Sequence, residues 1–446
     1  MKVHFIAIGG SAMHNLALAL HQEGHLVTGS DDEIFEPSRG RLQKAGILPS
    51  EMGWNADRIH SGLDAVILGM HAREDNPELA KTKELGLSIY SYPEFLFEQT
   101  KNKPRLIIGG SHGKTTITSM VLHAMQANGV EPDYMVGALL DGFECSVRLS
   151  DDAPVAVFEG DEYLSSPIDR RPKFHLYAPT VGLISGIAWD HMNVFPTYEN
   201  YVDQFKIFID KIEDGGTLVY NAEDPEVKRL AEESIRNIKM IPYGTPEYRI
   251  EEGKAIVQFE GQDFSMEVFG QHNLQNMEGA RHICAAAGIN AVDFFNAMSS
   301  FKGASRRLEK LFERDGQICY RDFAHAPSKL EATTKAVREM YPDRKFIACL
   351  ELHTFSSLNR EFLDHYANKM DSPDIAAVYY SPEVVARKKL AHFEPEEVMA
   401  GFARQDLKVF TDASELRKFV DAQPTEDTVL LLMSSGNWGG IMPVDL

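Results

Sequence analysis

The chain has 446 residues and a formal net charge of −21, with 45 Lys and Arg against 66 Asp and Glu. This excess of acid argues against a nucleic-acid or anionic-membrane ligand, because both are bound through surplus Lys and Arg. The four cysteines are widely spaced without a metal-type motif, and no signal-peptide core or membrane-length apolar run is present, which favours a cytoplasmic protein. The length exceeds one ordinary hydrophobic core and predicts about three domains.

Residues 1–103 alternate short apolar runs with helix-period patterns, which predicts a parallel sheet with crossover helices, a Rossmann-like domain. Gly9 and Gly10 follow the first strand, and Asp31 ends the second, where a dinucleotide fold keeps its ribose-binding acid. The GxGxxG pattern is incomplete, because His14 stands where a third glycine is expected. We therefore expect a loop for the diphosphate of another nucleotide. Tight turns that only pack the sheet are the alternative.

Residues 104–305 form the predicted central domain, which begins with a strand, a glycine turn and a helix in "RLIIGGSHGKTTITSMVLHAM". The spacing departs from the common phosphate loop, because Ile108 stands where its first glycine belongs. The order of elements still directs backbone N–H groups and a helix N-terminus at phosphates. We expect Lys114 to reach the terminal phosphates of ATP and Thr115 to bind magnesium. A plain turn beside a solvated lysine is the alternative.

Two further apolar runs of this domain end in polar residues. "APVAVFEGDEY" ends a strand at Glu159, and the run Thr180–Ala188 leads to His191. An acid that ends a strand beside the phosphate-loop strand is typical of a metal ligand, and His191 beside it predicts a metal or phosphate contact. His191 as a hydrogen-bonded loop residue is the alternative. His272, Asn273 and Asn276 open a later helix, where Asn ordinarily serves only as a cap.

Residues 306–446 repeat the strand–helix pattern and predict a second Rossmann-like domain. Its strands are expected at Ile318–Asp322, Phe346–Glu351, Ala376–Tyr380, Lys408–Phe410 and Thr428–Met433. Pro327 is expected at the first position of a helix. Ligand-facing positions should lie just past the strand ends, at 322–325, 351–357 and 434–440.

The motifs "GGSHGKTT", "FEGDEY", "DH", "GQHNLQN", "RRLE" and "DFAHAPSK" occur in one order along nearly the whole chain. In order and spacing they resemble the Mur ligases, a family that includes the short glycine loop. The resemblance implies an α/β fold of three domains, with a mostly parallel sheet in the central phosphate-loop domain. It also implies ATP-dependent joining of an amino acid or peptide to the carboxylate of UDP-N-acetylmuramic acid in peptidoglycan biosynthesis. ATP and two Mg²⁺ ions are the implied cofactors.

The resemblance implies a role for each matching position. Lys114, His191, Arg307 and His325 would be catalytic. Asp322 and His325 would come from the third domain, which would close over ATP. The implied phosphate loop consists of Gly110, Ser111, His112, Gly113, Lys114, Thr115 and Thr116, and Arg307 would contact the γ-phosphate. Magnesium would be bound by Thr115, Glu159 and His191, and adenine would be contacted by His272, Asn273 and Asn276. UDP would be contacted by Gly9, Gly10, Ser11, Ser30 and Asp31.

The acceptor is expected to be L-alanyl-γ-D-glutamyl-meso-diaminopimelate, because the insert Ile168–Phe174 and the ending "LMSSGNWGGI" resemble the tripeptide-adding branch of the family. Arg170, Arg171 and Lys173 would offer cations to ligand carboxylates. Free L-alanine is the alternative acceptor, and "LELHTFSSLNREF" matches neither branch. A nucleotide-gated binding or regulatory protein and a dehydrogenase are the alternatives of other classes.

The general base is not evident from the sequence. Lys206 is more simply a solvated helix lysine than a carbamylated metal bridge. Only small-molecule partners are expected, for a monomer or a weak homodimer.

Overall fold

The computed structural model of the chain describes residues 1–140, 142–189 and 194–441. Within these residues the strands form sheets of four, seven, three and six strands. Packing groups the chain into two compact units, Met1–Gly244 with Gly279–Ala297, and Thr245–Glu278 with Met298–Leu446. The fold is α/β with mainly parallel sheets, as the sequence predicts.

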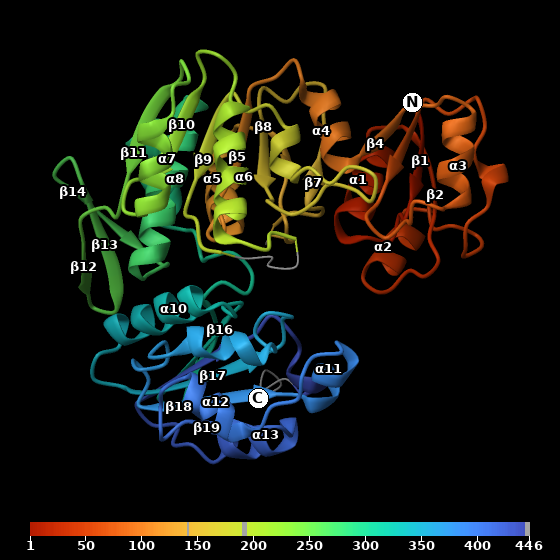
Figure 1. Cartoon of the computed structure of the whole chain (residues 1–446). Coiled ribbons are helices and arrows are strands. Elements are labelled where there is room, and N and C mark those ends of the chain that lie inside the picture. The colour runs from red at the N-terminus through yellow and green to blue at the C-terminus, as the bar shows by residue number, and fades with distance from the viewer. Residues whose placement is uncertain (141, 190–193, 442–446) are drawn as a thin grey trace. The chain divides into compact units, whose positions relative to one another are not determined.

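The first sheet belongs to the first unit and is parallel throughout, in the order β2-β1-β3-β4 (Figure 1, red to orange). Apolar strand residues such as Phe5 and Ile67 are fully buried between helices, as expected for a parallel sheet covered on both faces. The elements are β1 (Lys2–Ile6), α1 (Ser11–Gln22), β2 (Leu26–Ser30), α2 (Ser38–Lys44), η1 (Ala56–Arg58), β3 (Ala65–Leu68), α3 (Pro77–Glu84), β4 (Ile89–Ser91) and α4 (Tyr92–Thr100).

The second sheet has the order β11-β10-β9-β5-β8-β6-β7 and is parallel except where β6 pairs with β7. The central strand β5 lies between β8 and β9, with Ile108 opposite Glu159 and Gly109 opposite Ile184. The carboxyl ends of these three strands therefore meet at one edge, which positions the site described below. The elements are β5 (Arg105–Gly109), α5 (Lys114–Ala127), β6 (Asp133–Met135), β7 (Val147–Arg148), β8 (Ala156–Gly160), η2 (Lys173–Leu176), β9 (Val181–Ile184), α6 (Tyr198–Asp210), β10 (Thr217–Asn221), α7 (Pro225–Glu233), β11 (Lys239–Tyr243), α8 (Gln271–Ala286) and α9 (Ala291–Met298).

Polar contacts join the two sheets of the first unit. The Arg41 guanidinium, from α2, donates to the carbonyl oxygen of Glu144 at 2.8 Å. The Cys145 thiol lies 3.0 Å from Oδ1 of Asn15, a residue of α1. The start of α1 is thereby held beside the β6–β7 connection.

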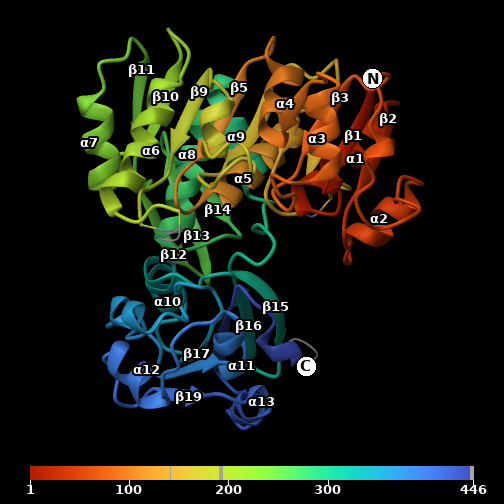
Figure 2. The same ribbon diagram turned by 45° about the vertical axis from the view of Figure 1, so that its right-hand side comes forward.

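The second unit contains an antiparallel sheet, β12-β13-β14, and a six-stranded sheet of order β15-β16-β20-β17-β18-β19 in which only β15 is antiparallel. Alternate residues of the large sheet, such as Ile347 and Leu430, pack with Leu416 and Val420 from one face of α13. Figures 1 and 2 show α10 and α13 on opposite sides of this sheet. The elements are β12 (Tyr248–Glu251), β13 (Lys254–Phe259), β14 (Gln262–Met266), β15 (Glu309–Arg314), β16 (Gln317–Asp322), α10 (Pro327–Met340), β17 (Lys345–Leu352), η3 (Arg360–Tyr366), β18 (Ile375–Tyr380), α11 (Pro382–Arg387), α12 (Pro395–Gly401), β19 (Lys408–Phe410), α13 (Ala413–Asp421), β20 (Thr428–Met433) and η4 (Trp438–Gly440).

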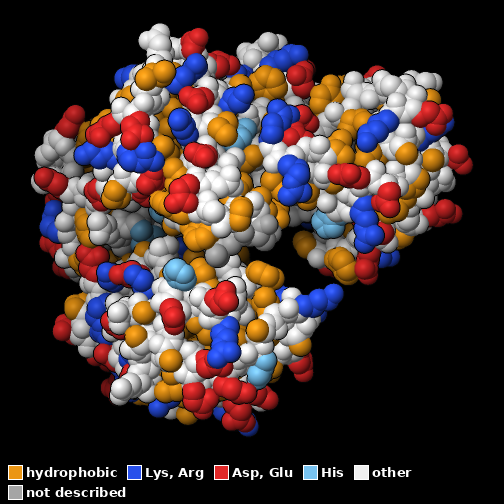
Figure 3. Space-filling view, viewed as in Figure 1, with side chains coloured by type: hydrophobic (Ala, Val, Ile, Leu, Met, Phe, Trp, Pro, Cys, Tyr) orange, Lys and Arg blue, Asp and Glu red, His pale blue; other side chains and the backbone are white. Residues whose placement is uncertain are grey.

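The surface carries mixed charge over most of the face in Figure 3. Exposed ion pairs of the chain include Arg229–Glu233 and Arg249–Asp263. The four cysteines are free thiols, and all four are buried. Among the helices of the described residues, none combines the length and apolar character needed to cross a membrane.

Candidate active site

The turn between β5 and α5 is shaped by its glycines. Gly110 has φ of 135°, a conformation that favours glycine, and a Cβ built there would lie 2.0 Å from the Ser185 hydroxyl oxygen. Gly113 has φ of 79° and leads into α5, whose first residue is Lys114. The helix N-terminus therefore follows the turn directly, and its N–H groups and dipole favour a bound phosphate.

The same turn is bonded to the segment that follows β9. The Ser111 N–H donates to the carbonyl oxygen of Gly186 at 3.0 Å, and the Ala188 N–H donates to the Ser111 hydroxyl at 2.7 Å. The Ser185 hydroxyl donates to the carbonyl oxygen of His112. These bonds hold the loop in shape.

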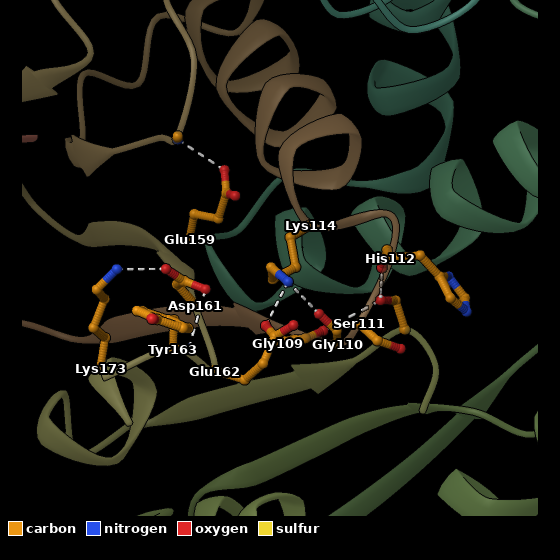
Figure 4. Close-up of polar contacts among 12 residues, drawn as sticks. Gly109, Gly110, Ser111, His112, Lys114, Glu159, Asp161, Glu162, Tyr163 and Lys173 are labelled. Carbon is orange, nitrogen blue, oxygen red and sulfur yellow. Dashed lines mark hydrogen bonds and ion pairs between the residues drawn. The ribbon is translucent and has the colours of Figure 1, made fainter. Parts of the chain in front are cut away.

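Lys114 projects along the loop (Figure 4). Its Nζ lies 2.6 Å from the carbonyl oxygen of Gly110 and 2.5 Å from Oε2 of Glu162. The other carboxylate oxygen of Glu162, Oε1, accepts from the Tyr201 hydroxyl at 3.1 Å. Burial lowers the pKa of Lys114, but the charges of Glu162, Asp161 and Glu159 and the hydrogen bond to Glu162 together raise it by more, so the net shift is upward. The side chain is thus a cation at neutral pH, as an ATP phosphate contact requires.

Thr115 and Glu159 come together from different elements, the first turn of α5 and the end of β8. The Thr115 hydroxyl donates to Oε1 of Glu159 at 3.1 Å, and the Gly137 N–H donates to its Oε2 at 2.8 Å. Burial raises the pKa of Glu159, and the Gly137 N–H and the charge of Lys114 offset part of that effect. A hydroxyl and a carboxylate are the hard oxygen ligands that Mg²⁺ prefers, so the pair fits the predicted metal.

His191, the other predicted metal contact, lies outside the described residues. In the part of the chain that the structure describes, no cluster of three or more His, Cys, Asp or Glu side chains is arranged to hold a metal ion. The support for magnesium is therefore the Thr115–Glu159 pair beside the phosphate loop.

A cavity of about 250 Å³ adjoins this pair. Glu159 and Asp161 from the end of β8 line one part of it, and Ser11 at the start of α1 lines another. The other lining residues are Ala12, Tyr92, Met135, Val136, Gly137, Ser146, Val147 and Lys173. The cavity thus connects the phosphate-loop side of the second sheet with the first helix of the N-terminal sheet.

The N-terminal glycine turn is closed by its own acid. The Gly9 N–H donates to Oδ2 of Asp31 at 2.7 Å, and a Cβ at Gly9 would lie only 2.9 Å from that oxygen. The hydroxyl of Ser30, which is also buried, donates to the buried carboxylate of Glu78. Of the predicted UDP contacts, Ser11 lines the cavity, whereas Ser30 and Asp31 bond within the domain.

Helix α8 is divided between the two units, and the predicted adenine contacts lie on its first turns, which belong to the second unit. Asn273 and Asn276 are buried, and His272 is partly exposed. The Asn273 amide donates to the carbonyl oxygen of Phe269 at 3.0 Å, and Gly270 before it has φ of 86°. The helix start is therefore fixed by a side-chain bond to the preceding turn, while the adenine role stays a prediction.

Arg307, Asp322 and His325 gather in the second unit. The Arg307 guanidinium lies 4.4 Å from the centre of the Phe323 ring, and Nδ1 of His325 is 2.8 Å from the Phe323 carbonyl oxygen. The buried Asp322 carboxylate accepts from the Leu308 and Ala324 N–H groups, both at 2.6 Å. Burial raises the pKa of Asp322, and the charge of Arg307 offsets part of that effect. Asp322 thus holds the backbone on which Arg307 is placed.

Several polar residues of the site were not assigned from the sequence. Glu162 pairs with Lys114, Ser185 sets the space available at Gly110, and Gly137 bonds Glu159. Of these three, only Glu162 is marked by a sequence motif, since it is the second acid of "GDEY". Lys206 lies on the exposed side of α6.

Comparison with known proteins gives matches along the chain. The Mur ligase catalytic-domain model matches residues 2–103, the Mur ligase middle domain matches 108–284, and the Mur ligase glutamate ligase domain matches 306–436. A UDP-N-acetylmuramate–L-alanine ligase of Sulfurihydrogenibium sp. (strain YO3AOP1) is 31% identical over 388 residues, which cover 84% of this chain and 82% of the relative.

Solved structures resemble the whole fold. A UDP-N-acetylmuramate–alanine ligase from Thermotoga maritima has a TM-score of 0.71 at 21% identity, and a murein peptide ligase from Psychrobacter arcticus 273-4 has a TM-score of 0.66 at 21% identity. Each comparison covers 99% of this chain and 97% of the other. With matches to all three Mur ligase domain models and a phosphate loop, the chain belongs to the Mur ligase family of ATP-dependent ligases that act in peptidoglycan synthesis.

Proposed function

We propose that the enzyme joins the carboxylate of UDP-N-acetylmuramic acid to the amine of L-alanine. The observation that carries the donor assignment is one cavity lined both by Glu159, beside Thr115 and the phosphate loop, and by Ser11 of the N-terminal turn. A donor with a nucleotide at one end and a reacting carboxylate at the other fits this arrangement. The relatives named as L-alanine ligases support the acceptor, which was the alternative expectation from the sequence.

The chemistry requires activation of the carboxylate, because an amine does not displace oxide at neutral pH. Transfer of the γ-phosphate forms a bond from phosphorus to a carboxylate oxygen and releases ADP. The amine then attacks the acyl carbon, inorganic phosphate leaves, and the amine proton passes to a base. No covalent bond to the protein is needed. The protein's part is to position the reactants and to neutralise charge.

Lys114 supplies a fixed cation at the phosphate loop, and its bonds to Gly110 and Glu162 hold it there. Thr115 and Glu159 would hold Mg²⁺, which neutralises phosphate charge when bound. Arg307 is proposed to reach the γ-phosphate, on a backbone fixed by Asp322. The second metal is proposed to contact His191. Adenine is proposed to contact His272, Asn273 and Asn276, and His325 is proposed to come from the domain that closes over ATP.

The tripeptide L-alanyl-γ-D-glutamyl-meso-diaminopimelate is the second candidate acceptor. The insert Ile168–Phe174 and the ending Leu432–Ile441 favour it by sequence. The insert's Arg171 pairs with Asp169 at 2.6 Å and with Glu94 at 3.2 Å. The Arg171 side chain is thus held on the surface and does not line the cavity, so it offers no cation there. We also propose the cytoplasm as the compartment, because the substrates include ATP and the cysteines are free thiols.

The test compares phosphate release from ATP with UDP-N-acetylmuramic acid fixed and each acceptor varied, with and without Mg²⁺. We expect release to need both the UDP-sugar and the metal, with a higher kcat/KM for L-alanine. A higher kcat/KM for the tripeptide would assign the enzyme to the second candidate reaction. Absence of UDP-sugar-dependent release with either acceptor would contradict the proposed donor.

A further inference from the structure

Lys173 is built into the wall of the cavity. It is the first residue of η2, and its side chain is 17% exposed. Nζ lies 2.5 Å from Oδ2 of Asp161 and within 5.8 Å of the ring centres of Tyr92 and Tyr163. Figure 4 shows Lys173 extended toward Asp161. Two aromatic rings and one carboxylate thus fix this ammonium group in place.

The backbone around Lys173 is equally fixed. Its N–H donates to the carbonyl oxygen of Tyr163 at 2.9 Å. The next residue, Phe174, is fully buried and stacks on Phe208 with ring centres 4.8 Å apart. The position of the lysine therefore comes from the domain core and not from a loose surface loop.

Arg171, a second cation of the same insert, is arranged differently from Lys173. The Arg171 side chain is 58% exposed, and it is bonded to Asp169 and Glu94 on the surface. Among the described residues that line the cavity, Lys173 is the only Lys or Arg. The insert thus places the largely buried Lys173 in the cavity wall, whereas the exposed Arg171 does not line the cavity.

The proposed donor brings a negative charge into this cavity. Its carboxylate has to approach the phosphate loop near Glu159, while its nucleotide end lies toward Ser11. Two carboxylates already line that part of the cavity, so a third would be repelled unless a cation faced it. Lys173 is the cation in the right place, and Asp161 keeps it extended.

We infer that Lys173 binds the carboxylate of the UDP-sugar donor and thereby selects a muramic acid over a sugar without that acid. This inference rests on the proposed function. It assigns the insert to the donor, whereas the sequence suggested the acceptor. Lys173 keeps its proton throughout: phosphoryl transfer breaks the bond from phosphorus to ADP and makes the bond to the carboxylate oxygen. The lysine only donates a hydrogen bond and holds charge.

The test measures binding of UDP-N-acetylmuramic acid and UDP-N-acetylglucosamine by calorimetry, without ATP or acceptor. The second ligand lacks the lactyl carboxylate. In K173M we expect the preference for the muramic acid to fall at least tenfold, about 1.4 kcal/mol, with UDP-N-acetylglucosamine affinity within about twofold of wild type. R171M, a cation removed from the same insert, should keep the wild-type preference. K173R should retain most of it.

A K173M protein that keeps the wild-type preference, or that loses both ligands equally, would overturn the inference. Should K173M unfold because Asp161 loses its partner, the double variant D161N/K173M, which removes both charges, gives the same measurement. Wild-type enzyme that binds neither UDP-sugar would instead overturn the proposed donor. The two failures are therefore distinguishable.

Discussion

Two turns of the first unit join a parallel strand to a helix through glycines, Gly9–Gly10 after β1 and Gly109–Gly113 after β5. In each, the neighbouring strand ends in an acid. At the first turn Asp31 accepts the Gly9 N–H itself. At the second, Glu159 bonds Thr115 and Gly137, and a lysine begins the helix. The strand–glycine–helix pattern therefore predicts a turn. The acid of the neighbouring strand in the sheet determines whether the N–H groups of that turn are already bonded or are left to bind a ligand.

The largest effect should come from Lys114, the residue that most distinguishes the second turn from the first. We expect K114A to lower the rate of phosphate release by about a thousandfold, since one preorganised charge contact is lost. K206A, on the exposed side of α6, is the matched control and should leave the rate unchanged.

Folding must be separated from catalysis in this variant. Removing Lys114 leaves the Glu162 carboxylate, which is 1% exposed, without its cation. We expect K114A to lose about 3 kcal/mol or more of its free energy of unfolding. K114A/E162Q should recover much of that stability and none of the activity. A double variant that regains activity would show that Lys114 acts on the fold alone.

The next largest effect should appear when Gly110 and Gly10, one glycine from each turn, are replaced by alanine and the free energy of unfolding is measured by urea denaturation. G110A should lower the free energy of unfolding by at least about 2 kcal/mol, because it combines a positive φ with overlap at Ser185. G10A should change it by less than about 0.5 kcal/mol, because Gly10 has φ of −58° and its added Cβ would lie 3.4 Å from Met13. Equal losses would mean that both turns are similarly constrained.

The smallest effect concerns Asp31. D31A should cost about 1–2 kcal/mol at pH 7, because the Gly9 N–H loses its acceptor. D31N keeps an acceptor oxygen and should cost less than half as much. Unchanged stability in D31A, together with lost UDP-sugar affinity, would show that the acid serves the ligand and not the turn.

The stability of D31N relative to wild type should also depend on pH. Burial raises the pKa of Asp31 above 3.8, with a further contribution from Asp32, so the folded protein takes up this proton at a higher pH than the unfolded chain. Ionised Asp31 therefore lowers stability above its folded pKa, and that loss disappears as the pH falls below it. Stability of D31N relative to wild type should be highest at pH 7 and should decline on acidification. A difference that grows on acidification would contradict this assignment.

Much of the fold follows from local pattern. The strands expected at Lys408–Phe410 and Thr428–Met433 coincide with β19 and β20, and Pro327 begins α10. β20 is a buried parallel strand, and such strands give plain apolar runs. The antiparallel sheet β12–β14 was missed. Its strands are half exposed, and only the turn glycines Gly253 and Gly261, with φ of 73° and 79°, marked it.

The site was predictable only where its chemistry lies within a motif. Lys114, Thr115 and Glu159 follow from the order of elements, since parallel strands end at one edge. The Glu162 partner of Lys114 and the approach of Ser185 to Gly110 depend on distances across the fold. Asp31 shows the limit most clearly, because an acid that binds a ribose and an acid that closes a turn occupy the same place in a sequence.

The buried cysteines have a practical consequence. Burial raises the pKa of the Cys319 and Cys349 thiols to about 12, and burial also raises the pKa of Cys284. The thiolate is the nucleophile, so these three side chains should react slowly with maleimides at neutral pH. The fourth thiol, Cys145, is shielded from the reagent by its burial. A cysteine introduced on each unit would then carry a fluorescent dye without removal of the natural thiols. Energy transfer between the two dyes would test the closure over ATP that the family resemblance implies, in the otherwise native enzyme.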